Sequence, residues 1–257
     1  MGPSGPFLFP LWKPAIEKVR EILESLRDDN FSYDADLVGT TRGGVDAVEP
    51  LRKKRFQIDH NQVCIGSGEA AFQRAKKAVR DWRHFQLGWA TVDPDTPIRE
   101  RERVAVVARS FGLVWTLNPL QILYVDDGTD SPSTSSTREE SSTNEKRNGG
   151  SRSGGRKARA KVGPGAVERE EGLSGGVSTK ARFAYGHGTL KGHLLSGEER
   201  FLVEWRDDDS VWYDILAFSR PGHFLAAATY PAARFYQRQF AKQSMRAVQA
   251  AVEEDPD

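Results

Sequence analysis

The sequence predicts an α+β fold in which a curved antiparallel sheet packs around a long C-terminal helix. Short segments of alternating apolar and polar residues follow one another with tight turns, which is typical of an antiparallel meander. The chain then ends in a long helical segment with one apolar face, and such a helix needs a sheet to lie against. This order argues against a doubly wound parallel fold.

Two amphipathic helices are predicted in the N-terminal part. The first runs from Pro14 to about Asp28, and its apolar face is formed by Ile16, Val19, Leu23 and Leu26. The second runs from about Glu69 to Arg83. Its inward residues are Phe72, Ala75, Val79 and Trp82, and its outward residues are Arg74, Lys76, Lys77 and Arg80.

A series of strands is predicted next, in the segments "GWATVD", "RVAVVARS", "VWTLNPLQILYV", "KARFAYGHG", "ERFLVEW" and "VWYDILAFS". Pro119 indicates a bulge or bend in the third of them. In the last two strands, alternation predicts one shared face formed by Phe201, Val203, Trp205, Val211, Tyr213 and Ile215.

The C-terminal segment predicts a short helical piece, "HFLAAATY", and then a long helix. Pro231 suits its first turn, and the helix extends to about Val252. We expect an inner stripe of Tyr236, Phe240, Met245, Val248 and Val252. The solvent side is marked by Arg234, Arg238, Lys242 and Arg246.

One segment, from about Gly128 to Lys180, has no aromatic residue and almost no large aliphatic one. Such a composition cannot bury enough apolar surface to offset the entropy lost on ordering, so a disordered insertion at the tip of a hairpin is predicted. We therefore expect residues 1–30 to be an N-terminal extension with a helix. Residues 31–257 are expected to form a single α+β domain that this insertion interrupts.

Composition excludes several classes of protein. Lys+Arg number 37 against Asp+Glu 36, so the net charge of +1 gives no reason to expect nucleic acid as a partner. The single cysteine, Cys64, forms no internal disulfide and is interpreted as an inert core thiol. No apolar run approaches the ~20 residues of a membrane span, and no secretory signal is evident. We expect an intracellular, cytoplasmic protein.

The stretch "FAYGHGTLKGHLLSGEERFLVEW" has the richest polar chemistry. His187 and His193 could ligate a metal only with further ligands from Glu198 or Glu199, and nothing in the spacing requires this. Its glycines are explained by close backbone approach between strands. A second pattern, Gly66, Gly68 and Ala71, imitates a dinucleotide turn but lacks the following acidic strand end. We expect no metal and no cofactor.

The adjacent acids Glu198 and Glu199 precede an apolar strand, so their side chains should point to opposite faces. An inward carboxylate beside His193 would be a general acid or base. The alternative is a structural anchor, bonded to Arg220 or to backbone N–H groups.

The segments "YGHGTLKGHLLSGEERF", "VWYDILAFSRPGHFL" and "YPAARFYQRQFAKQS", with "FSYDADLVGTT" and "LNPLQILYV", resemble uncharacterised protein family 0548. The resemblance spans about residues 31–251 without the insertion. It implies a helix-grip (START/Bet v 1-like) architecture and no established reaction. In that family, small residues stand where this chain has His187, which favours His193 as the site histidine.

Two functions are expected from this reading. The favoured one is binding of a hydrophobic small molecule between the sheet and the C-terminal helix, with ligand contacts from Tyr185, Gly186, Thr189, Tyr213, Ser219 and Arg220. The alternative is a cofactor-free isomerase, cyclase or hydrolase in which His193 and either Glu198 or Glu199 transfer protons.

Overall fold

The computed structural model describes residues 5–10, 12–26, 31–110, 112, 114–128, 178–222, 227–228 and 230–254. They belong to one compact unit, Met1–Asp130 with Val177–Asp257. Most of the predicted insertion lies outside the described residues. The predicted insertion, residues 128–180, is slightly too long at both ends, because strand β5 extends to Gly128 and strand β6 begins at Thr179.

The centre of the unit is an eight-stranded sheet in which every pairing is antiparallel. The strand order is β2-β8-β7-β6-β5-β4-β3, and β1 also pairs with β5. The strands are β1 (Phe7–Phe9), β2 (Gln57–Ser67), β3 (Ala90–Thr91), β4 (Arg103–Ser110), β5 (Val114–Gly128), β6 (Thr179–Thr189), β7 (Leu195–Arg206) and β8 (Ser210–Pro221). Strands β3 to β8 follow one another as neighbours, so the predicted meander is confirmed.

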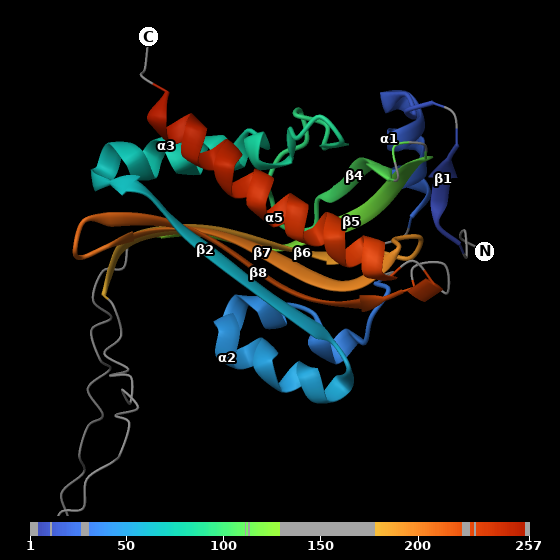
Figure 1. Cartoon of the computed structure of the whole chain (residues 1–257), viewed down its shortest axis with the longest axis horizontal. Coiled ribbons are helices and arrows are strands. Elements are labelled where there is room, and N and C mark those ends of the chain that lie inside the picture. Colours follow the sequence, from blue (N-terminus) through green and yellow to red (C-terminus); the bar gives the residue numbers. More distant parts are fainter. Residues whose placement is uncertain are drawn as a thin grey trace, which may run out of the picture. The chain divides into compact units, whose positions relative to one another are not determined.

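Helices cover both faces of this sheet (Figure 1). Helix α5 (Tyr230–Glu253) crosses the concave face together with α3 (Gly68–Arg80). The short helix α2 (Gly44–Val48) covers the other face, between the 3₁₀ turns η2 (Thr40–Gly43) and η3 (Glu49–Lys54). Helix α1 (Ile16–Ser25) packs on β4. Turns η1 (Ala35–Leu37) and η4 (Arg83–Phe85) complete the unit. A curved sheet that grips a C-terminal helix is the helix-grip architecture, as predicted.

The alternation of side chains along the strands builds two cores. Phe201, Val203 and Tyr213 are buried on the concave face against α3 and α5, which confirms the shared face predicted for β7 and β8. Residues of β8 that point to the other face, such as Leu216 and Phe218, pack against residues of the α2 region: Tyr33, Leu37, Val48, Leu51 and Phe56.

Four expectations about local structure were wrong. Pro119 pairs in register with Ala105, and the irregularity of β5 lies instead between Ile122 and Tyr124. Ile16 is exposed while Ile22 is buried. Cys64 is exposed, because it lies on the edge strand β2 and its side chain faces solvent. Arg234, expected on the solvent side of α5, forms a half-buried ion pair with Asp59 of β2.

The helical piece predicted at residues 223–230 falls largely outside the described residues, although 227–228 are helical. None of the described helices is both long and apolar enough to cross a membrane.

Candidate functional site

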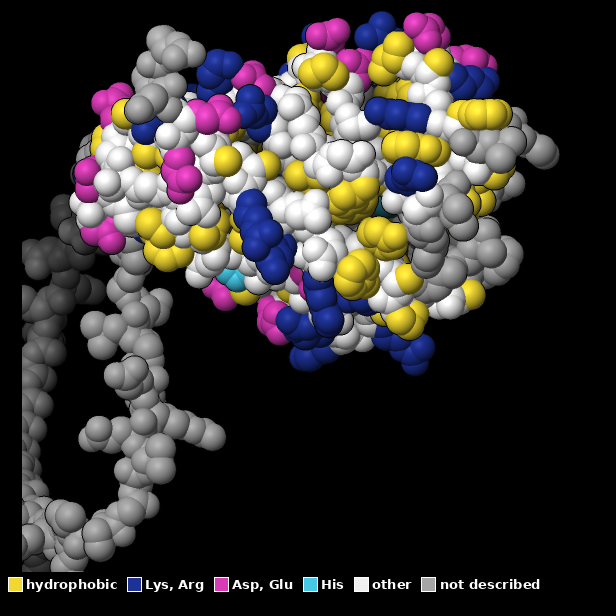
Figure 2. Space-filling model, turned by 45° about the horizontal axis from the view of Figure 1, so that its top comes forward, with side chains coloured by type: hydrophobic (Ala, Val, Ile, Leu, Met, Phe, Trp, Pro, Cys, Tyr) yellow, Lys and Arg dark blue, Asp and Glu magenta, His cyan; other side chains and the backbone are white. Residues whose placement is uncertain are grey.

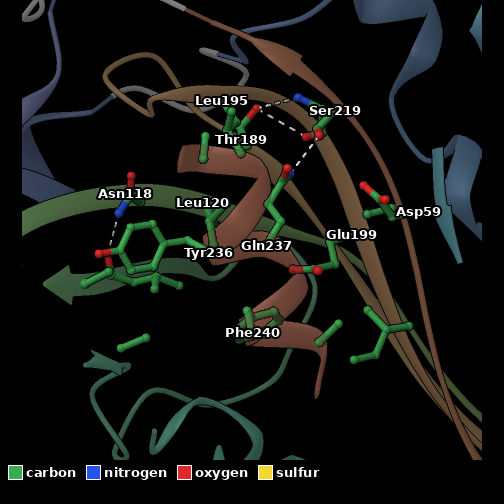
Figure 3. A pocket seen from close by; sticks show the side chains of 18 of the residues that line it. Asp59, Asn118, Leu120, Thr189, Leu195, Glu199, Ser219, Tyr236, Gln237 and Phe240 are labelled. Carbon is green, nitrogen blue, oxygen red and sulfur yellow. Dashed lines mark hydrogen bonds between the residues drawn. The ribbon is translucent and has the colours of Figure 1, made fainter. Parts of the chain in front are cut away.

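A cavity of about 440 Å³ lies between the concave face of the sheet and the N-terminal half of α5. Most of its lining is apolar, including Phe85, Trp89, Val106, Leu120, Ile215, Phe240 and Met245. Polar side chains also line it, among them Asp59, Asn118, His187, Thr189, Glu199, Ser219, Tyr236 and Gln237. Figure 3 shows the strands on one side of this space and α5 on the other.

A gradient of side-chain size along the strands creates this cavity. At one end of the concave face, large residues fill the space under α3 and the C-terminal half of α5: Phe183, Tyr185, Phe201, Val203 and Tyr213. Further along the same strands stand the small residues Thr189, Gly197, Ala217 and Ser219. Because these side chains are too small to fill the space under α5, volume remains open beneath its first turns.

Gly197 is required by the close approach of β7 to β8. Its φ angle is +152°, and a Cβ atom there would lie 1.9 Å from the carbonyl oxygen of Phe218. Its N–H donates to Oγ1 of Thr189 at 2.9 Å, across to β6. The prediction that the glycines of this stretch allow close backbone approach is confirmed at this position.

Two polar contacts hold α5 over the cavity. Nε2 of Gln237 donates to Oγ of Ser219 at 3.0 Å, as Figure 3 shows. The guanidinium of Arg234 donates to both carboxylate oxygens of Asp59, at 2.5 and 2.6 Å. Both contacts join the first half of the helix to neighbouring strands, β8 and β2, at the edge of the sheet.

His187 and Glu199 face each other across the β6–β7 pair. Nε2 of His187 lies 3.5 Å from Oε2 of Glu199, and the His187 side chain is only 4% exposed. Nδ1 of His187 is buried and has no hydrogen-bond partner among the residues that the structure describes. The Glu199 side chain is 25% exposed, and its carboxylate projects toward the space beside Phe240 in Figure 3. This is a polar pair whose hydrogen-bonding capacity is mostly unused.

His193 also lines the cavity, and its Nδ1 accepts the N–H of Leu195 at 2.9 Å. Burial lowers the pKa of His193 to about 3, with a further contribution from nearby His187. The ring is therefore neutral near pH 7, and since Nδ1 accepts, its hydrogen is on Nε2. No hydrogen bond joins His193 to Glu198 or Glu199 among the described residues.

Glu198 has its carboxylate on the opposite face of the sheet. It accepts hydrogen bonds from Oη of Tyr33 at 2.8 Å, from the N–H of Gly39 at 2.5 Å, and from both N–H and Oγ1 of Thr41 at 3.1 and 3.0 Å. Burial nevertheless raises the pKa of this carboxyl above its ordinary value. The prediction that the two adjacent acids point to opposite faces is confirmed, and Glu198 anchors the turn at residues 39–41.

Of the nine predicted site residues, four turn their side chains to the cavity or its rim: Thr189, His193, Glu199 and Ser219. A fifth, Glu198, borders the cavity but has its carboxylate on the opposite face of the sheet. Four lie elsewhere. Tyr185 and Tyr213 are fully buried in the aromatic core, where their hydroxyls bond His84 and Ser244. Gly186 faces the ring of Tyr124, on the α2 side of the sheet. Arg220 stacks over the ring of Phe56 at 4.5 Å.

Sequence reasoning missed several lining residues. Asp59, Asn118 and Tyr236 were not singled out as site residues, and His187 was set aside in favour of His193. Alternation contained a usable signal for His187, because it shares a strand face with Phe183 and Tyr185. Within the part of the chain that the structure describes, no three His, Cys, Asp or Glu side chains are grouped to hold a metal ion.

Comparison with known proteins identifies the family. The family model described as "Domain of unknown function (DUF1990)" matches residues 36–247. The chain belongs to this family. A UPF0548 protein of Arabidopsis thaliana is 31% identical over 245 residues, covering 94% of this chain and 96% of the relative. A UPF0548 protein of Dictyostelium discoideum is 27% identical over 255 residues, covering 95% and 96%. The resemblance to family 0548 is thereby confirmed for this DUF1990 chain.

Solved structures similar to this DUF1990 chain are distant. The hypothetical protein jhp0584 from Helicobacter pylori has a TM-score of 0.40 with 12% identity, covering 76% of this chain and 86% of that one. The crystal structure of Ara h 8.0201 has a TM-score of 0.36 with 9% identity, covering 78% and 99%.

Proposed function

We propose that this protein binds a small, largely apolar molecule in the cavity beneath α5. The observation that supports this most directly is the cavity itself, whose volume of about 440 Å³ is within the range of small-molecule sites. Most of its lining is aliphatic or aromatic, with a few polar groups that can orient a ligand.

Burial of apolar ligand surface would supply most of the binding free energy. Each 100 Å² of apolar ligand surface removed from water contributes about 2.5 kcal/mol before the cost of association is subtracted. The first turns of α5 border the cavity and are held by the bonds from Gln237 to Ser219 and from Arg234 to Asp59, so breaking these contacts would widen access to it. Breaking a few polar contacts at a helix end is a modest cost for opening a pocket.

A cavity-filling substitution tests this proposal. Ala217 lines the cavity, whereas Ala250 is exposed on the same α5 helix that covers it. The fluorescence of N-phenyl-1-naphthylamine, an uncharged apolar dye, should rise on addition of the wild-type protein. The rise should be lost in Ala217→Phe and kept in Ala250→Phe. Mass spectrometry of an organic extract then identifies any co-purified molecule. Equal dye binding by both variants would place the dye outside the cavity and remove the support for the proposal.

A proton-transfer enzyme is the second candidate, and the contact between His187 and Glu199 favours it. In such an enzyme, Glu199 would remove a proton from carbon next to a carbonyl group and return it, while His187 orients the carboxylate. Exchange of solvent deuterium into 2-tetralone measures this step directly. Exchange faster than in buffer that disappears in Glu199→Gln would support catalysis. If tetralone binds but exchanges deuterium only at the buffer rate, catalysis is contradicted and only the binding function remains.

A further inference from the structure

Most polar groups in the cavity already have partners. Gln237 bonds Ser219, Asp59 bonds Arg234, and Nδ2 of Asn118 donates to Oγ1 of Thr116 at 3.0 Å. Buried polar groups in folded proteins are almost always paired in this way. The exceptions in a cavity therefore indicate where a bound molecule supplies the missing partner.

Three unused polar groups lie among the residues that line the cavity. The carboxylate of Glu199 accepts no hydrogen bond among the described residues, and its nearest polar contact is His187 at 3.5 Å. His187 is only 3% exposed, and its Nδ1 has no hydrogen-bond partner in the described part of the chain. His193 carries its hydrogen on Nε2, because its Nδ1 accepts the N–H of Leu195, and no described residue accepts a hydrogen bond from this Nε2–H.

From this arrangement we infer that the cavity takes an apolar ligand with a neutral hydroxyl group, which donates its hydrogen to Glu199 beside His187 and His193. The inference rests on the proposed function, since it concerns the ligand of the same cavity. A carboxylate is acceptor-only and needs a donor, whereas the Nε2–H of His193 needs an acceptor. A hydroxyl group supplies both in one atom, so it matches this part of the cavity.

The charges around the cavity disfavour ionic ligands. Arg238 and Lys242 lie one helical turn apart on α5, line the cavity and are exposed. Neither has an acidic partner among the described residues, so these two positive side chains disfavour an ammonium group that passes them. A carboxylate ligand, in turn, would be repelled by Glu199 inside. Figure 2 shows Lys and Arg side chains interspersed with hydrophobic ones on this side of the molecule.

Four naphthalene derivatives with the same ring test the inference by isothermal titration calorimetry at pH 7. They are 2-naphthol, 2-methoxynaphthalene, 2-naphthylmethylamine and 2-naphthoate. We expect 2-naphthol to bind about tenfold or more tightly than 2-methoxynaphthalene, because only the former donates to a carboxylate. We expect the two ionic compounds to bind more weakly than 2-naphthol.

Two matched variants assign this preference to a residue. Glu199→Leu removes the acceptor, and the ratio of naphthol to methoxynaphthalene affinity should fall to about one. Glu204→Leu removes an acid from the same strand on its other face, where Glu204 bonds Arg206 at 2.7 Å, and the ratio should be unchanged. Because the ratio is measured within one variant, a general change in affinity does not alter the result.

Each outcome separates this inference from the proposed function. Equal binding of naphthol and methoxynaphthalene to the wild-type protein would overturn the hydroxyl preference and keep the apolar cavity. Tightest binding of the amine or the carboxylate would also overturn it. Absence of binding by all four compounds, together with absence of dye binding, would overturn both. A preference that survives Glu199→Leu would overturn the assignment to Glu199.

Discussion

Glu198 and Glu199 are adjacent in the sequence, yet they lie on two faces of the sheet that differ in how polar groups are satisfied. On the α2 face, the carboxylate of Glu198 accepts four hydrogen bonds from Tyr33, Gly39 and Thr41. On the α5 face, Glu199 has one distant contact with His187. The two side chains have the same chemistry, and only strand alternation separates them.

This difference teaches which polar residues are structural and which are available. A buried acid surrounded by donors is committed to the fold, because its removal leaves those donors without partners. A cavity acid with little hydrogen bonding contributes little to stability and is free to bind something else. The adjacent pair therefore offers an internal control for every experiment on this site.

The largest expected effect is on the α2 face. Glu198→Ala leaves the donors of Tyr33, Gly39 and Thr41 buried without an acceptor, so the free energy of unfolding should fall by about 3–5 kcal/mol. Urea denaturation followed by circular dichroism measures this loss. A loss below about 1 kcal/mol would contradict the structural role of Glu198, because it would mean that water replaces the carboxylate at the 39–41 turn.

A pH titration tests the closed end of the concave face. His84 is completely buried and bonds Oη of Tyr185 at 2.6 Å, and burial lowers its pKa well below the ordinary value. The unfolded chain therefore binds a proton below about pH 6.5 that the folded chain does not. The contribution of His84 to the free energy of unfolding is therefore fully present above that pH. It is lost as the pH falls, by about 1.4 kcal/mol per pH unit.

The matching variant for this titration is His84→Gln. It should show a shallower decline in unfolding free energy between about pH 6.5 and 4.5, relative to its own value above pH 7. Parallel curves for the variant and the wild-type protein would show that His84 takes up a proton in the folded state.

A smaller effect is expected at the open end, where α5 joins the sheet edge. Arg234→Ala breaks two charge-assisted hydrogen bonds to Asp59, so unfolding free energy should fall by about 1–2 kcal/mol. Release of the uncharged dye N-phenyl-1-naphthylamine, followed by stopped-flow fluorescence, should become faster. Arg246→Ala, at an exposed position of the same helix, is the control and should change neither quantity.

The smallest effect is expected for Glu199→Leu, which sharpens the comparison with Glu198. Removing a partly buried carboxylate that has little hydrogen bonding should change the unfolding free energy by less than about 1 kcal/mol, with a tendency toward greater stability. Urea denaturation under the same conditions as for Glu198→Ala gives the result. A loss as large as that of Glu198→Ala would show that Glu199 is also structural.

The sequence predicts those parts of the fold in which the apolar residues repeat with the period of a strand or of a helix. Strands β7 and β8 alternate clearly, and α3 repeats its apolar residues at helical spacing, so both were placed correctly. Strand β2 was not predicted as a long strand, because it lies at the sheet edge and only Ile58 and Ile65 are buried. Its residues give no strong alternation to read.

The candidate site was harder to predict because it depends on register between strands. Alternation separates Glu198 from Glu199, but pairing His187 with Glu199 requires the alignment of β6 with β7. The cavity likewise depends on small residues of three strands meeting beneath one end of α5. No single segment shows this, which is why the sequence alone did not distinguish Tyr185 and Tyr213, which are buried in the core, from residues that line the cavity.

The two ends of the hairpin formed by β5 and β6 differ in how far their sequence and length can change. The strands pair from Leu120 and Thr189, beside the cavity, to Gly128 and Arg182, about 26 Å further along β5. Since the cost of closing a loop rises only slowly with its length, the chain joining the far ends can be shortened, extended or exchanged without moving the residues of the cavity. A reporter protein could be inserted there for experiments. In evolution, segments can likewise be added at this end of the hairpin while the end beside the cavity is unchanged.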